Sequence, residues 1–469
     1  MPRRSSGAMK ARPAASDRRV RPKAVLKGRP TSSQVRRPAR SVPAKARKAV
    51  VRRRPAASKA SKEARRPVSA AQRRPAAAQA KVPRKALDVA VRRTRGSWSV
   101  EAAPNGMSGP RREGVFRFLR DKLHLVGAEG ELLARLVLQP VELGAPSAQD
   151  AASGPKALPL IEVVAGEIIA EIQDPGNSGA FFVLPSQLNG AEYPSHEIVV
   201  LDVDHYRWDK TAGPRGQLAV HPAVGQFLLN NAANLERRGG ISTAKELLKV
   251  MHKKRHRDFF LENGYLRLPW LQGEEAEAAV TALDQNIGEL RTLAACDVPA
   301  TGLSPDFGSW SEASHRVNLV YGSALPVDAY NNKAAGDGEV IAAQQKVSSA
   351  FLRGAYLGTL RLALEERIVG LPRTKVFLMP LGGGVFNNSR EAIAQSMSDA
   401  IEIANDQLCG GDLGSHLDIR LLTYSGNPAE ATAFSELLHD LGKLKVSTNS
   451  IVPAKLERAR SNPRPNGSG

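Results

Sequence analysis

Residues 376–388 read Val-Phe-Leu-Met-Pro-Leu-Gly-Gly-Gly-Val-Phe-Asn-Asn and predict a buried strand that runs into a glycine loop. A helix is expected next, because apolar residues recur at helical spacing from Ile393 to Leu408. Asn388 is the expected N-cap residue of that helix, with Glu391 three positions further on. The stretch therefore predicts a strand, a loop and a helix N-terminus in direct succession.

The three consecutive glycines predict a binding site for a phosphate group. Backbone N–H groups at a helix N-terminus attract an anion, and glycine lets that backbone approach without a Cβ in the way. No Lys-Ser or Lys-Thr pair and no Gly-x-Gly-x-x-Gly spacing is present, so the usual triphosphate and dinucleotide loops are excluded. The alternative is a tight turn without a ligand. The residues assigned to the ligand are Gly382, Gly383, Gly384, Val385, Phe386, Asn387 and Asn388.

Short apolar runs alternate with helical patterns and predict an α/β fold, with a sheet covered by helices on both faces. Ligands of such sheets usually bind beyond the carboxyl ends of the strands. Strands are expected at residues 160–164, 180–184, 197–203, 265–268, 316–321, 375–381 and 417–424. Helices are expected at residues 222–235, 274–293, 338–367, 389–408 and 428–441.

The pattern divides this part of the chain into an α/β domain with an insertion, an extension before it and a tail after it. Residues 159–455 form the α/β domain, and residues 274–293 are a helical insertion in it. Residues 113–158 are expected to be a helical N-terminal extension, because apolar residues recur at helical spacing from Val115 onward. Residues 456–469 are expected to be a short disordered tail.

Residues 1–112 are predicted to be a disordered tail rich in Arg, Lys, Pro and Ala. Residues 1–100 hold 31 Lys and Arg against three acidic residues, a net charge of +28, whereas the rest of the chain carries −7. One interpretation is an arm, residues 1–97, that binds nucleic acid independently of sequence, because aromatic residues for stacking are missing. The other is a solubilising or targeting leader. The basic clusters favour the nucleus, with the cytoplasm or an organelle as alternatives.

Composition excludes several classes of protein. Two cysteines, Cys296 and Cys409, are too few for a disulfide framework, and no apolar stretch is long enough to span a membrane. His252 and His256 are spaced for zinc on a helix, but the basic residues between them favour a solvated surface. We therefore expect no metal, no cofactor and no membrane partner.

Several motifs resemble the macro domains and the related poly(ADP-ribose) glycohydrolases. Gly383-Gly-Val-Phe386 is similar to their phosphate loop, in which the aromatic ring contacts the distal ribose. Residues 163–169, Val-Val-Ala-Gly-Glu-Ile-Ile, resemble an opening motif whose acid contacts adenine, which implies that role for Glu167. Asn189 resembles the last residue of the motif Asn-Ala-Ala-Asn, and residues 264–269 resemble Gly-Tyr-x-Leu-Pro. The resemblance implies a macro-like mixed sheet sandwiched between helices, and ADP-ribose or an ADP-ribosylated protein as partner.

The sequence also departs from that pattern. The glycine run and the Gln-Glu-Glu signature that carries the glycohydrolase acid are absent, so the resemblance favours binding over hydrolysis. The place of the glycine run is taken by residues 209–217, either a second ligand loop with Asp209, Thr211 and Arg215 or a capped turn. Residues 231–234 copy Asn-Ala-Ala-Asn, but their apolar spacing predicts the end of a helix.

Two further residues are candidates because they follow a strand toward the same edge of the sheet: Ser323, and Tyr330, which either stacks on adenine or packs inside the fold. The main hypothesis is a binder of ADP-ribose or a related nucleotide diphosphate. The first alternative is an ADP-ribosyl glycohydrolase with Asp209 as the catalytic residue. The second is a nucleic-acid-associated structural protein whose core has no ligand.

Overall fold

The computed structural model divides the chain into residues 1–76 and Ala77–Gly469, and every described residue lies in the second unit. The residues that the structure describes are 93–94, 97–100, 114–119, 122–127, 131–141, 157–193, 200–235, 241–256, 259–267, 272–303, 309–327, 338–367, 373–423 and 427–449.

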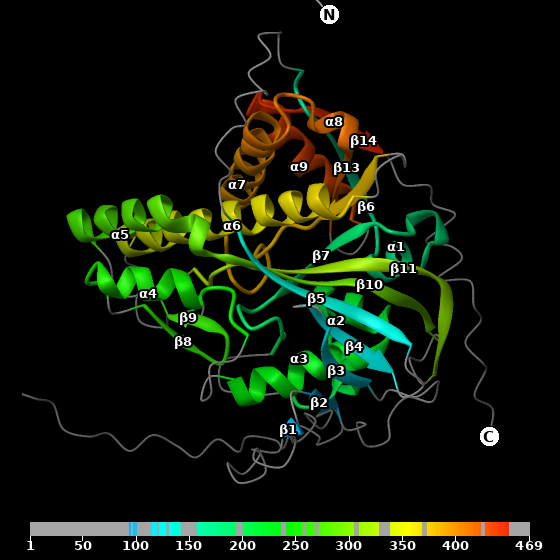
Figure 1. Cartoon of the computed structure of the whole chain (residues 1–469). Coiled ribbons are helices and arrows are strands. Elements are labelled where there is room, and N and C mark those ends of the chain that lie inside the picture. The colour runs from blue at the N-terminus through cyan, green and yellow to red at the C-terminus, as the bar shows by residue number, and fades with distance from the viewer. Residues whose placement is uncertain are drawn as a thin grey trace, which may run out of the picture. The chain divides into compact units, whose positions relative to one another are not determined.

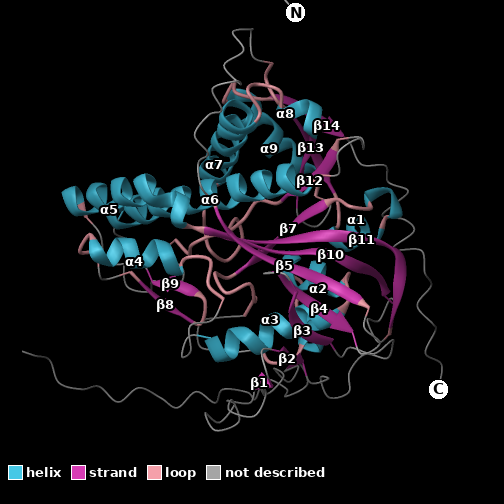
Figure 2. Cartoon of the chain, in the orientation of Figure 1, coloured by secondary structure: helices cyan, strands magenta, loops and turns pink. Residues whose placement is uncertain are grey.

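A mixed sheet of twelve strands forms the centre of this unit (Figures 1 and 2). Its strand order is β1-β2-β3-β4-β5-β10-β11-β7-β12-β13-β6-β14. In this order, each pair of neighbouring strands from β1 as far as β11 is antiparallel. Each neighbouring pair from β11 through β7 to β14 is parallel. The strands are β1 (Arg93–Thr94), β2 (Ser97–Val100), β3 (Gly114–Leu119), β4 (Lys122–Gly127), β5 (Leu132–Pro140), β6 (Leu160–Ala165), β7 (Phe181–Ser186), β10 (Arg291–Leu303), β11 (Trp310–Ser323), β12 (Thr374–Leu378), β13 (Leu417–Thr423) and β14 (Lys445–Asn449). A separate hairpin consists of β8 (Phe260–Glu262) and β9 (Tyr265–Arg267).

Helices cover both faces of the sheet (Figure 2). Alternate side chains of β7 enter two different cores: Phe181 and Val183 join one, and Phe182 and Leu184 join the other. The first core includes α4 (Lys245–Lys253), α5 (Gly273–Asn286), α6 (Gly338–Glu366), α7 (Arg390–Ile403) and α9 (Pro428–Asp440). The second includes α1 (Ile168–Gln173), α2 (Ala212–Leu218) and α3 (Pro222–Leu235).

The predicted α/β fold class with a sheet between helices is confirmed. The helix over residues 231–234 is also confirmed, because α3 runs to Leu235 and contains the Asn-Ala-Ala-Asn copy. Five of the predicted strands coincide with strands of the main sheet, and a sixth, at 265–268, is β9 in the hairpin. Among the described residues no helix is long and apolar enough to cross a membrane.

Four predictions about elements are wrong. Part of the segment expected to be disordered, residues 1–112, forms the strands β1 and β2, and the rest of that segment lies outside the described residues. The extension at residues 113–158 is not helical: its described part forms β3, β4 and β5, where Leu133 and Leu136 enter the second core from a strand. The helical insertion at 274–293 ends as α5 at Asn286, and β10 begins at Arg291. The end of the strand expected at 197–203 is a loop, with residues 194–199 outside the described residues.

Candidate functional site

A cleft of about 590 Å³ lies where the parallel strands β7, β11 and β12 end. This is the edge at which α/β sheets usually bind ligands, and the volume is typical of small-molecule sites. The lining residues are Pro185, Ser186, Gln187, Glu192, Tyr193, Asp209, Thr211, Ala212, Tyr265, Gly322, Ala324, Met379, Pro380, Leu381, Gly382, Gly383, Gly384, Val385, Phe386, Arg390, Asn427, Glu430 and Phe434.

The predicted glycine loop forms one wall of this cleft. Gly382 adopts a φ of +74°, and a Cβ there would lie 2.5 Å from Asn388 Nδ2, so the turn requires glycine. Gly384 and Val385 are exposed, and within the described part of the chain their N–H groups donate to no protein acceptor. The loop therefore offers free backbone donors to a ligand in the cleft.

Asn388 holds the loop in place from beneath rather than capping the following helix. It is buried, and its Nδ2 donates to Leu325 O at 2.9 Å while its Oδ1 accepts from Gln345 Nε2 at 3.1 Å. The prediction that Asn388 is the N-cap of the helix was wrong by one position. Ser389 is the N-cap of α7, and its Oγ accepts from Ala392 N at 3.1 Å.

A cluster of polar side chains forms a second wall. Asp209 Oδ1 accepts from both the backbone N–H and the hydroxyl of Thr211, at 2.8 and 2.7 Å. The Thr211 hydroxyl also lies within hydrogen-bond reach of the Glu192 carboxyl, so it stands between two acidic side chains. The two predicted residues Asp209 and Thr211 are therefore brought together in the cleft.

Glu192 is the most perturbed acid of this cluster. Burial raises the pKa of its carboxyl to about 8; the interaction with the Thr211 hydroxyl opposes this increase, and the nearby charge of Asp209 adds to it. Its Oε2 is shielded from solvent and has no hydrogen-bond partner in the described part of the protein. Glu192 is thus predominantly a neutral carboxylic acid at pH 7.

Aromatic side chains and a glutamine form the floor between these walls. Tyr265 and Phe386 pack edge to face with their centroids 5.8 Å apart, and Tyr265 donates its hydroxyl to Tyr193 O at 2.8 Å. Gln187 is 97% buried; its Nε2 donates to Tyr193 O at 3.1 Å, which leaves Oε1 without a partner in the described residues. The floor therefore offers apolar surface, whereas the Gln187 amide oxygen is shielded from solvent.

Two helix N-termini meet at the cleft beyond the glycine loop. Arg390 is the first residue of α7, and Asn427 caps α9 by accepting from Ala429 N at 3.1 Å. Glu430, in the first turn of α9, accepts two hydrogen bonds from Arg390, at 3.0 and 2.7 Å. These helices meet because β12 and β13 are parallel neighbours in the sheet.

Six of the predicted residues that the structure describes lie outside the lining of the cleft: Glu167, Asn189, Arg215, Ser323, Asn387 and Asn388. Glu167 and Arg215 pair with each other, with Arg215 Nη1 3.3 Å from Glu167 Oε2. Asn189 is buried, and its Oδ1 accepts from Ala191 N at 3.1 Å. Asn387 is exposed at a φ of +54° and serves the turn of the loop. Glu167, Arg215 and Asn189 therefore have partners within the protein.

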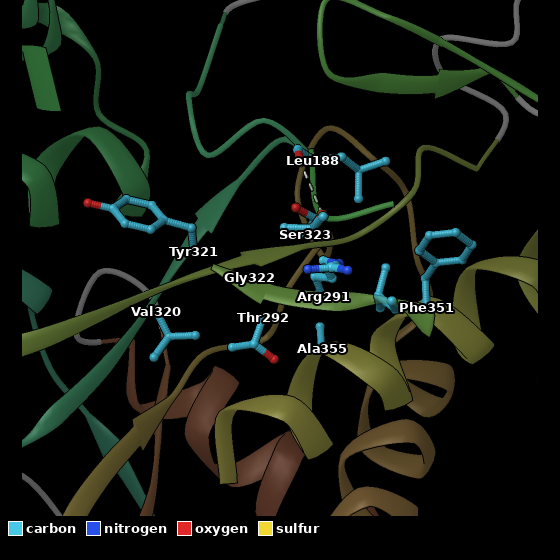
Figure 3. A pocket seen from close by; sticks show the side chains of 11 residues that line it. Leu188, Arg291, Thr292, Val320, Tyr321, Gly322, Ser323, Phe351 and Ala355 are labelled. Carbon is cyan, nitrogen blue, oxygen red and sulfur yellow. Dashed lines mark hydrogen bonds between the residues drawn. The ribbon is translucent and has the colours of Figure 1, made fainter. Parts of the chain in front are cut away.

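Ser323 lines a separate small cavity of about 10 Å³ (Figure 3). Its Oγ and the Oγ1 of Thr292 are buried there without a partner among the described residues, and the volume has room for about one water molecule. Ser323 is outside the lining of the main cleft, whereas its neighbours Gly322 and Ala324 line it. Tyr330 lies outside the described residues.

Five residues of the site were not predicted from the sequence: Gln187, Tyr265, Arg390, Asn427 and Glu430. Arg390 directly follows the loop and its predicted cap, so its position alone pointed to it. Asn427 and Glu430 could be placed only with the neighbouring order of β12 and β13. Among the described residues, no group of three metal-ligating side chains is present.

Comparison with known proteins gives structural neighbours only. No family model and no curated protein matches the sequence. The structure is similar to the poly(ADP-ribose) glycohydrolase of Deinococcus radiodurans in complex with ADP-ribose, with 13% identity, a TM-score of 0.32 and coverage of 65% of this chain and 94% of that one. The glycohydrolase of Thermomonospora curvata bound to the inhibitor ADP-HPD gives 16% identity, a TM-score of 0.33 and coverage of 68% and 93%.

The third comparison is with a macrodomain mutant of Oceanobacillus iheyensis, at 11% identity, a TM-score of 0.26 and coverage of 60% of this chain and 88% of that one. These neighbours are the two kinds of protein that the sequence motifs resemble. The function of this chain is inferred from the residues of its own cleft.

Proposed function

We propose that the protein binds ADP-ribose or a related nucleotide diphosphate, free or attached to a protein, in the cleft beside residues 382–386. The observation that carries the proposal is the pair of exposed, unpaired N–H groups at Gly384 and Val385 on the wall of the cleft. A diphosphate is the part of such a ligand that backbone donors bind best. The Tyr265–Phe386 floor offers apolar surface for a ribose or a base.

Calorimetric titration of ADP-ribose into the full chain tests this proposal. Gly384→Glu is the blocking variant, because a Cβ at Gly384 meets no atom within 4 Å and the variant should stay folded while its carboxylate repels the diphosphate. Gly414→Glu is the matched control, since Gly414 also has open space but lies in α8 (Leu413–His416), outside the cleft lining. Binding by the wild type and Gly414→Glu, but not by Gly384→Glu, supports the proposal; no binding by the folded wild type contradicts it.

Hydrolysis of an ADP-ribosyl bond is the second candidate function. It is favoured by Glu192, a neutral acid at pH 7, on the same wall as the Asp209 carboxylate. In the reaction Glu192 would protonate the leaving oxygen as the bond from the ribose anomeric carbon breaks. Asp209 would accept a proton from the water whose oxygen forms the new bond.

Release of ADP-ribose from an ADP-ribosylated protein, measured by chromatography, tests the second function. Glu192→Gln and Asp209→Asn should each stop turnover while binding of ADP-ribose persists. Full turnover by either variant would remove that residue from the mechanism. A wild type that binds ADP-ribose without turnover would leave only the binding function.

We propose that residues 1–97 associate with nucleic acid through their positive charge, and that the protein is located in the nucleus. The composition of the segment supports this, because Lys and Arg that neutralise phosphates release counterions. DNA affinity should fall steeply with salt concentration and vanish when residues 2–97 are deleted, while ADP-ribose binding survives. Imaging of the tagged full chain and of the deletion tests the location.

A further inference from the structure

The ion pair between Arg390 and Glu430 lies on the wall of the cleft, next to the glycine loop. Arg390 donates from Nε to Glu430 Oε1 at 3.0 Å and from Nη2 to Glu430 Oε2 at 2.7 Å, which is a two-point pairing of guanidinium and carboxylate. Both residues line the cleft, and Arg390 is six positions after Gly384. The pair therefore borders the space in which the diphosphate is proposed to bind.

Arg390 is the only cationic side chain in the lining of the cleft, as far as the described residues show. The acidic side chains there are Glu192, Asp209 and Glu430. A diphosphate in the cleft thus meets carboxylates as well as backbone donors, and only Arg390 can offset that negative charge. In the structure, however, Glu430 pairs with this guanidinium.

Separating Arg390 from Glu430 requires little free energy. The side chains of Arg390 and Glu430 are 55% and 25% exposed, and pairs of this kind contribute little to stability because water and salt screen them. A guanidinium binds phosphate oxygens with the same two-point geometry as a carboxylate. A diphosphate carries more negative charge than Glu430 and would therefore compete for Arg390.

Glu430 would remain stabilised after the exchange. It lies in the first turn of α9, three positions after the N-cap Asn427, where the helix dipole favours a negative charge. Losing Arg390 would therefore not leave its carboxylate without compensation.

We propose that Arg390 is a phosphate-binding residue that pairs with Glu430 until a ligand enters the cleft. The guanidinium then leaves the carboxylate and binds a phosphate oxygen of the diphosphate. The inference rests on the proposed function and deepens it. Glu430 then acts as a positioning residue and as a competitor that lowers affinity for the anion.

A double-mutant cycle measured by calorimetry with ADP-ribose tests the exchange. Arg390→Gln should weaken binding by roughly tenfold or more, because a charge-assisted hydrogen bond is lost. Glu430→Gln should tighten binding several-fold, and this gain should disappear in the double variant. Arg353→Gln is the matched control, since Arg353 pairs with Asp284 at 2.7 Å outside the cleft lining. All four variants should unfold at nearly the wild-type temperature.

The outcomes separate the two proposals. If Gly384→Glu abolishes binding but Arg390→Gln leaves the affinity unchanged, the exchange is wrong and the loop site stands. If Glu430→Gln weakens binding in both backgrounds, Glu430 contacts the ligand itself and the exchange is also wrong. If the folded wild type binds no ADP-ribose, the proposed function and the exchange fall together.

Discussion

The Glu192 carboxyl and the Pro185 carbonyl both face the Cα of Gly213. A Cβ at Gly213 would lie 1.9 Å from Glu192 Oε2 and 2.0 Å from Pro185 O, so these two oxygens are neighbours. Both oxygens therefore border the space that a side chain at position 213 would occupy, and Glu192 Oε2 is buried without a hydrogen-bond partner among the described residues.

Gly213→Ala should destabilise the protein, because the new methyl group would overlap both oxygens. We expect the free energy of unfolding to fall by about 1–3 kcal/mol, as for other overpacked positions. Gly213 lies in α2, where alanine alone would favour the helix, so any loss must come from the overlap. Denaturant unfolding measures it, with Gly414→Ala as the control in open space. Unchanged stability of Gly213→Ala would contradict the close contact.

Glu192→Gln should remove a pH dependence of stability. An unfolded glutamate has a pKa of 4.5, whereas the pKa of Glu192 in the folded chain is about 8. Between these values the folded chain keeps a proton that the unfolded chain has lost. The free energy of unfolding therefore falls as the pH rises through this window, and the loss is complete above about pH 8.

Thermal unfolding of the wild type and Glu192→Gln across this window checks the sign. The midpoint of the variant should rise relative to the wild type as the pH increases. Parallel curves would mean that Glu192 ionises at its ordinary pKa. Glu262→Gln, at a partly exposed glutamate of β8, is the control and should follow the wild type.

The glycines of the loop should divide into one that supports the fold and one that supports the ligand. Gly382→Ala would place a Cβ at positive φ, 2.6 Å from Ala324 Cβ, and should lower stability. Gly384→Ala meets no atom within 4 Å and should leave stability unchanged, while ADP-ribose binding weakens because the backbone is shielded. Calorimetry and thermal unfolding on both variants separate the effects; equal effects on both properties would show that the division is wrong.

Substitution of two neighbouring asparagines should affect the free energy of unfolding differently. Asn388→Ala removes a buried amide that bonds Leu325 O and Gln345, and should lower the free energy of unfolding by about 1–3 kcal/mol. Asn387→Gly replaces an exposed residue at positive φ by the residue that best tolerates it, and should cost nothing. Chemical denaturation distinguishes them. A larger loss at Asn387 than at Asn388 would overturn the assignment of the loop support.

The parallel half of the sheet was predictable because its strands alternate with helices that have clear boundaries. The predicted helix at 222–235 matches α3, and the strand before Gly382 matches β12 with its end a few residues early. The antiparallel half of the sheet was not predictable from the sequence. Apolar residues such as Leu132, Leu133 and Leu136 fit either a helix or a strand when no pairing partner is known. Their partner β10 was not predicted as a strand, and its first residues, 291–293, were assigned to the predicted helix at 274–293.

The candidate site was predictable where ligand groups come from one continuous segment. Residues 382–386 lie in the cleft as expected, because the loop geometry depends on their own glycines. Glu167 and Arg215 lie outside the lining of the cleft and pair with each other, a contact between distant segments that the sequence did not predict. The pKa of Glu192 depends on burial by several segments, and no local pattern of residues reports it.

The position of β6 between β13 and β14 has a consequence for folding kinetics. Strand β6 is early in the α/β part of the chain, yet both of its neighbours come from residues 417–449. More than two hundred further residues must therefore be synthesised before the N–H and C=O groups of β6 can form their native hydrogen bonds. Pairing over such separation makes for slow folding and exposes an unpaired apolar strand meanwhile. A nascent chain should therefore depend on chaperones until its last strand leaves the ribosome.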